Sequence, residues 1–154
     1  MSELDRLHER LTRLERAEAV RACMARYCRA LDEADLLRLG GVWGEHARFI
    51  HFDKTERVGR EEIIGFFSAT FNRPGRRLGV RHYVTSILVE VTGALSDFTA
   101  TATSTFLMVV PHEQPMLGQG HYLDEFTFLA DGSAVFTSKT VFLDHTTQLA
   151  LRGQ

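Results

Sequence analysis

The chain changes character at Pro74-Gly75, and this change limits the folds that it can adopt. Before that point, apolar residues recur at three- and four-residue steps, as they do on one face of a helix. After it, β-branched and aromatic residues dominate four long segments, at about 80–91, 98–110, 118–129 and 134–144, with turn residues between them. Helices followed by long antiparallel strands indicate an α+β fold, with the sheet curled over the helices.

The helical half is expected to hold three helices and one strand. Apolar residues from Leu14 to Leu31 form the stripe of an amphipathic helix, whereas residues 3–13 are helical in pattern but charged on most sides. These first residues are either a frayed extension or a contact with another subunit. Asp35 is the expected N-cap of a short second helix that ends at Gly40-Gly41. A first strand at 47–52 and a third helix at 59–71 follow.

Length and composition bound the broad class of protein. The 154 residues, with no internal repeat or linker, fit one domain spanning 1–154, with its core at about 14–145. A net charge of −2 argues against a nucleic-acid partner. No apolar run is long enough to span a membrane, and the charged N-terminus is unlike a secretory signal, so we expect a cytoplasmic protein. Cys23 and Cys28 are expected to be free thiols because their spacing turns them apart on a helix.

Two polar residues stand out as candidates for chemistry. Asp32 falls in the last turn of the first long helix, and because Asp35 is the better N-cap, Asp32 has no evident structural role. His82 begins a strand whose residues on the same side are mostly apolar. A neighbouring carboxylate would hold the imidazole in one tautomer and stabilise its protonated form, as a general base requires. The alternative is a core histidine bonded to a backbone carbonyl.

The same strand predicts an interface. If it alternates regularly, one side carries Tyr83, Ile87, Val89 and Val91, and this side is the outer face of the sheet. So much apolar surface on one face of a small domain usually marks a contact between proteins. We therefore expect a homo-oligomer, either a trimer or a dimer.

Several segments together resemble a known family, namely RYCRALDEADLLRLGGVW, HYVTSILVEV, FTATATSTFLMVV and GHYLDEFTFLADG. They are similar, in order and spacing, to the SnoaL-like branch of the nuclear transport factor 2-like superfamily. That resemblance covers about Leu14 to His145. It implies a cone-shaped fold, in which a curved, mixed or antiparallel sheet wraps around three N-terminal helices. Within the branch, the chain resembles scytalone dehydratase, bile-acid 7-alpha-dehydratase and hexachlorocyclohexane dehydrochlorinase.

The resemblance also implies roles for individual residues. His82 takes the position of the base that removes a carbon-bound proton, and Asp32 that of the residue that orients it. Tyr27, five residues before Asp32, matches a phenol that donates to a substrate oxygen or leaving group. Lys139 is nearest to a cation that assists the leaving group, and Thr105 replaces an acid on the fourth strand. Four aromatic residues are expected either to line the pocket or to pack in the core: Trp43, Phe49, Phe67 and Tyr122.

The leading functional hypothesis is a dehydratase-like lyase or isomerase that needs no metal or cofactor and acts on a small hydrophobic molecule. A second is a non-catalytic module that binds ligands or partners in the same fold. A third is a polyketide cyclase or epoxide hydrolase, which would use carboxylates rather than a histidine. An Asp32–His82 hydrogen bond beside a cavity would favour the first, and further carboxylates in the cavity would favour the third.

Overall fold

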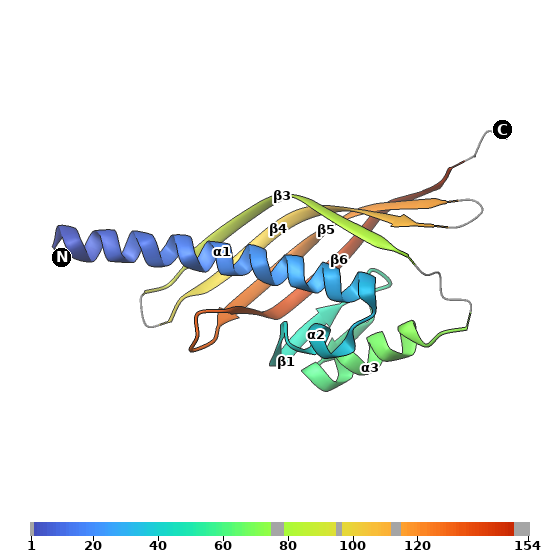
Figure 1. The fold of residues 1–154 in the computed structure, drawn as a ribbon, viewed down its shortest axis with the longest axis horizontal. Helices are drawn as coiled ribbons and strands as arrows, with labels where there is room; N and C mark the ends of the chain where they lie inside the picture. Colours follow the sequence, from blue (N-terminus) through green and yellow to red (C-terminus); the bar gives the residue numbers. More distant parts are fainter. Residues whose placement is uncertain (1, 75–78, 95–96, 112–114, 150–154) are drawn as a thin grey trace.

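The structure is a computed structural model that describes residues 2–74, 79–94, 97–111 and 115–149. One long helix, α1 (Glu3–Glu33), lies along a curved sheet, and two shorter helices, α2 (Leu36–Gly40) and α3 (Arg60–Phe71), gather near its C-terminal end (Figure 1). The expected α+β cone, with three helices against a curved sheet, is confirmed. No helix among the described residues is long and apolar enough to cross a membrane.

The helix boundaries follow from local chemistry. Ser2 and Asp5 form a capping box at the start of α1, so the charged N-terminal residues are continuous with the amphipathic part. Ala34 ends α1 in a left-handed conformation, with φ of 56°. Asp35 then caps α2 as predicted, because its side chain accepts a hydrogen bond from the backbone N–H of Arg38 at 3.0 Å.

The sheet has six strands in the order β2-β1-β6-β5-β4-β3. The first two are β1 (Trp43–Ile50) and β2 (Glu56–Val58), a short strand that was not predicted. The four long strands are β3 (Arg81–Thr92), β4 (Thr99–Val110), β5 (Met116–Phe128) and β6 (Ala134–Gln148), close to the predicted segments. Only the pairing of β1 with β6 is parallel among the described ladders; the others are antiparallel.

A bulge in β3 overturns the argument from regular alternation. Thr85 pairs with Thr105 and Leu88 pairs with Thr103, so β3 has one residue more than β4 in this interval. Ser86 accommodates it with a positive φ of 51°. The strand therefore changes sides: Ile87, Val89 and Val91 pack against the core instead of facing out. The expected apolar outer face is wrong, since Tyr83 alone of the four predicted residues lies there, 54 % exposed.

Candidate active site

Asp32 and His82 meet at the junction of α1 and β3. The Oδ1 atom of Asp32 lies 2.6 Å from Nδ1 of His82, and its Oδ2 atom accepts a hydrogen bond from the backbone N–H of His82 at 3.1 Å. Both side chains are mostly buried, with 11 % and 14 % of their surfaces exposed. A carboxylate that accepts the Nδ1 proton leaves Nε2 as the unprotonated nitrogen. Nε2 forms no hydrogen bond with any described residue.

The local fold places these two groups together. α1 ends one residue after Asp32, and the left-handed Ala34 turns the chain into α2. Because Asp35 takes over the capping of α2, the Asp32 carboxylate is free to reach the start of β3. The two residues are 50 positions apart in the sequence, so tertiary packing alone brings them within hydrogen-bond distance.

A cavity of about 550 Å³ opens beside the pair, between α1 and β3. Asp32 and His82 line it together with apolar side chains from both elements, among them Met24, Val84 and Ile87. The bulge in β3 contributes directly, because it turns Ile87 toward this side of the strand. Apolar side chains together with a small number of polar groups are the usual lining of a site for a small organic ligand.

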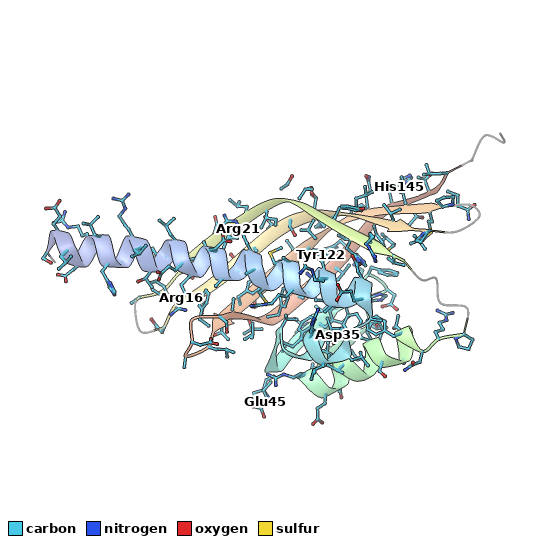
Figure 2. The ribbon with its side chains drawn as sticks, viewed as in Figure 1. Arg16, Arg21, Asp35, Glu45, Tyr122 and His145 are labelled. Carbon is cyan, nitrogen blue, oxygen red and sulfur yellow. The ribbon has the colours of Figure 1, made fainter. Side chains whose placement is uncertain are left out.

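The cavity also has a cationic border. Arg21 and Arg29 from α1 and Arg81 from β3 are among its lining residues, and Figure 2 shows Arg21 on the side of α1 toward β3. Arg29 forms no ion pair with any described residue. Glu33, the other carboxylate in the wall, is bound to Arg38 at 3.1 Å. The sequence interpretation missed Arg21 and Arg29, although they are spaced to share one face of a helix, and it assigned Arg81 to a solvated loop, with phosphate or carboxylate recognition as the alternative.

Five predicted residues lie in the core rather than in the cavity wall. Their exposed fractions are 5 % or less, and they are Tyr27, Trp43, Phe49, Phe67 and Tyr122. The Tyr27 ring packs edge-on against Trp43, Phe67 and Phe136, and burial raises the pKa of its phenol well above 10. The sequence had left open whether the four aromatic residues pack in the core or line the pocket, and the structure places them in the core. Tyr27 likewise does not reach the cavity as its predicted role requires.

Lys139 is also withdrawn from the cavity. Its Nζ atom lies 3.0 Å from Oδ1 of Asp124, and both side chains are almost fully buried, at 1 % and 0 % exposure. The ammonium group stands over the Tyr122 ring, 3.5 Å from its centroid. Burial raises the pKa of the Asp124 carboxyl, and Lys139 opposes this shift. Asp124 was missed, although it shares strand parity with the buried Tyr122 and could have been found on that basis.

Thr105 lies on the outer face of β4. Its neighbours Ser104 and Phe106 point inward, and regular alternation therefore turns Thr105 outward. There its hydroxyl bonds to that of Thr85 at 2.9 Å. The structure therefore does not bring Thr105 to the cavity, contrary to the role that the resemblance implied.

Both thiols are free, as predicted, and one of them lines the cavity. Cys28 lies one turn before Asp32 on α1, whereas Cys23 is fully buried. Burial raises the pKa of each thiol to about 11, so both are protonated near neutral pH. Among the described residues, no three His, Cys, Asp or Glu side chains are grouped so that they could hold a metal ion.

The sequence profile of the SnoaL-like domain matches residues 12–139. The chain belongs to the SnoaL-like domain family. This match covers α1 through most of β6 and so includes both Asp32 and His82. No curated protein sequence matched the chain.

Solved structures confirm the fold of this SnoaL-like domain. A scytalone dehydratase-like protein of Novosphingobium aromaticivorans DSM 12444 is similar over 92 % of each chain, with a TM-score of 0.77 and 18 % identity. The hexachlorocyclohexane dehydrochlorinase of Novosphingobium barchaimii LL02 is similar over 91 % of this chain and 94 % of its own, with a TM-score of 0.76 and 21 % identity. A nuclear transport factor 2-like protein of N. aromaticivorans is similar over 94 % and 92 %, with a TM-score of 0.73 and 23 % identity.

Proposed function

We propose that this SnoaL-like protein is a cofactor-independent lyase that eliminates water or another small leaving group from a largely apolar molecule. The observation that carries this proposal is the double hydrogen bond between Asp32 and His82 at the wall of a cavity. It leaves Nε2 of His82 as a base, beside a space for a ligand. The names of two structural neighbours, a dehydratase and a dehydrochlorinase, also describe eliminations.

In the proposed reaction, Nε2 of His82 removes a proton from a carbon next to an electron-withdrawing group. The electron pair of that C–H bond forms a C=C bond, and the leaving group departs with the electrons of its own bond to carbon. The Asp32 carboxylate stabilises the imidazolium that forms. When hydroxide departs, the imidazolium returns the proton to it as water; when chloride departs, the proton passes to solvent.

The contacts of the cavity favour this function over its alternatives. A binding module without catalysis would not need an imidazole held by a carboxylate, and here Asp32 binds both the ring and the backbone of His82. A carboxylate-based hydrolase or cyclase needs further free acids. Besides Asp32, the only acidic residue lining the cavity among the described residues is Glu33, which Arg38 neutralises.

The cationic border of the cavity favours substrates that carry an acidic group. Arg29 and Arg81 have no carboxylate partner among the described residues, so a substrate that carries an acidic group would gain a charge-assisted contact there. Candidate substrates should therefore include acids as well as neutral molecules. We expect an acid to be turned over better than its amide, and Arg29→Gln should narrow this difference.

The experiment is an elimination assay on a panel of compounds. The panel should contain alicyclic and aromatic β-hydroxy ketones, their carboxylated analogues with matching amides, and chlorinated cyclohexanes, with loss of water or HCl followed by mass spectrometry. His82→Gln should lower any turnover that the natural protein shows by a factor of about 10²–10⁴. His121→Gln is the matched control, because His121 forms a similar pair with Asp144, at 2.9 Å, on an exposed part of the sheet. Equal turnover by the natural protein and His82→Gln would contradict the proposal.

A further inference from the structure

The N-terminal part of α1 carries an exposed leucine stripe, which consists of Leu4, Leu7, Leu11 and Leu14. These side chains are 75 %, 53 %, 57 % and 68 % exposed. Their spacing of three, four and three residues is that of the a and d positions of a heptad. At about 100° per residue, the stripe lies on the side of α1 opposite to the residues that pack on the sheet. The prediction that Leu14 begins the core-facing side of the amphipathic helix is therefore wrong.

This stripe stands on a helix that is already fixed. Figure 1 shows the first turns of α1 extending beyond the sheet. The capping box of Ser2 and Asp5 closes one end, and Arg13 ties the other end to the sheet, where it donates to the carbonyl oxygens of Val91 at 2.9 Å and Gly93 at 3.0 Å. A partner would therefore meet a preformed helix and would not have to offset the cost of helix nucleation.

The charges beside the stripe argue against a membrane surface as its partner. Residues 3–16 contain four acidic and four arginine side chains. Helices that lie on membranes usually carry an excess of Lys and Arg on the polar face. A balanced set of charges around a heptad of leucines is instead typical of helix pairing between proteins.

We propose that the leucine stripe is a dimer interface, in which α1 pairs in parallel with α1 of a second copy of this chain. With leucines at a and d, Arg10 takes a g position and Glu15 the following e position. In a parallel pair, a g residue lies beside the partner's next e residue, so Arg10 meets the partner subunit's Glu15, and symmetry repeats this contact. Neither residue forms an ion pair with a described residue of its own chain.

Charge also sets the direction of the pair. In an antiparallel pair centred on the stripe, like positions would face each other, so Arg10 would lie beside Arg10 and His8 beside His8. In the parallel pair, Arg10 of one copy lies beside Glu15 of the other, and Glu3 of one copy lies beside His8 of the other. Asp32 lies at the opposite end of α1, so the proposed dimer does not depend on the proposed enzymatic function, and each can be tested without the other.

Sedimentation velocity on the full chain tests the interface. We expect a dimer at micromolar concentrations, and a monomer for the double variant Leu7→Glu/Leu11→Glu, whose helix content should stay unchanged by circular dichroism. Leu37→Glu is the matched control, because Leu37 is 88 % exposed on α2 and lies off the stripe. A natural protein that stays monomeric at about 100 µM would overturn the proposal. So would an oligomer that the double variant leaves intact.

Charge reversal tests the direction. Arg10→Glu and Glu15→Arg should each weaken the dimer by about three- to tenfold, because each replaces two attractions by two repulsions. Combining the two changes should restore the affinity. In an antiparallel pair, Arg10→Glu would only exchange an Arg–Arg repulsion for a Glu–Glu repulsion, whereas the neutral variant Arg10→Gln would relieve the repulsion. If Arg10→Glu leaves the affinity unchanged and Arg10→Gln strengthens the dimer, the helices pair antiparallel and the proposed arrangement is wrong.

Discussion

Asp32 holds His82 by both its ring and its backbone. One carboxylate oxygen lies 2.6 Å from Nδ1, and the other accepts the backbone N–H of the same residue at 3.1 Å. Rotation of the carboxylate would break at least one of these bonds, so the imidazole orientation is tied to the end of α1. Such positioning of a base by a fixed second group is what general base catalysis requires.

The first prediction concerns the imidazole tautomer in Asp32→Asn. The amide of asparagine can donate as well as accept, so Nδ1 is no longer forced to carry the proton. We expect the tautomer with the proton on Nε2 to gain population, while the thermal unfolding temperature changes little. Long-range ¹⁵N NMR of the His82 ring distinguishes the two forms above pH 8. An unchanged tautomer ratio would show that Asp32 does not set it.

The second prediction concerns the bulge in β3. Ser86 has a φ of 51°, which a side chain with a Cβ atom adopts only at a cost. Ser86→Gly should therefore stabilise the protein by about 0.5–1 kcal/mol, and Ser86→Val should destabilise it by about 1–2 kcal/mol. Urea denaturation measures both. The control is Thr101→Gly, at an exposed and regular position of β4, which should lose stability. A loss of stability in Ser86→Gly as large as in this control would contradict the account.

This bulge shows where sequence reasoning reaches its limit. Hydrophobic alternation located the four long strands, and the capping role of Asp35 was correctly predicted because both signals are local. Nothing local in the sequence around Ser86 marks an extra residue, since serine is no strong signal for a positive φ. The register against β4 decides it, and a single inserted residue reverses every later side chain of the strand.

The candidate site, like the fold, could be predicted only in part from the sequence. The resemblance to a family suggested that Asp32 and His82 meet, and no local pattern could have shown a contact across 50 residues. Aromatic residues that pack in a core and those that line a pocket carry the same sequence pattern, which is why the sequence left Trp43 open between the two and could not show that Tyr27 is buried in the core. The arginines at the cavity border look like ordinary solvated positions until β3 is laid against α1.

The third prediction concerns the buried ion pair of Lys139 and Asp124. Lys139→Met leaves a buried carboxylate without its partner, which should cost about 3–5 kcal/mol of unfolding free energy. The double variant Asp124→Leu/Lys139→Met should recover most of this loss, as urea denaturation would show. A double variant as unstable as the sum of its single variants would contradict the coupling.

The pH dependence of Lys139→Met follows from the same group. Burial raises the folded-state pKa of Asp124 above its ordinary value of 3.8, and without Lys139 nothing opposes that shift. The folded state then binds the proton more tightly than the unfolded state does. The contribution of Asp124 to the stability of Lys139→Met should therefore be greatest below about pH 4. It should fall as the pH rises through the raised pKa. Asp124→Leu/Lys139→Met should not show this fall.

The fourth prediction concerns the reactivity of Cys28. Its pKa is raised to about 11, so the thiolate fraction should keep rising with pH beyond the ordinary thiol pKa of 9. Alkylation by iodoacetamide should accelerate about tenfold per pH unit between pH 8 and 10, followed by peptide mass spectrometry. Unfolded protein is the control, and its rate should level off near pH 9. A native rate that levels off at the same pH would contradict the burial of this thiol.

The role of His82 as a base oriented by Asp32 is tested most directly by the rate of elimination in four proteins: the natural chain, Asp32→Asn, His82→Gln and the double variant. With a compound from the panel that is turned over, the value of kcat/KM should fall by about 10²–10⁴ in His82→Gln. Asp32→Asn should fall toward the same level, and the double variant should be little worse than His82→Gln, because the two residues act as a unit. A natural rate that survives in His82→Gln, or losses that simply multiply in the double variant, would contradict the role of His82 as a base oriented by Asp32.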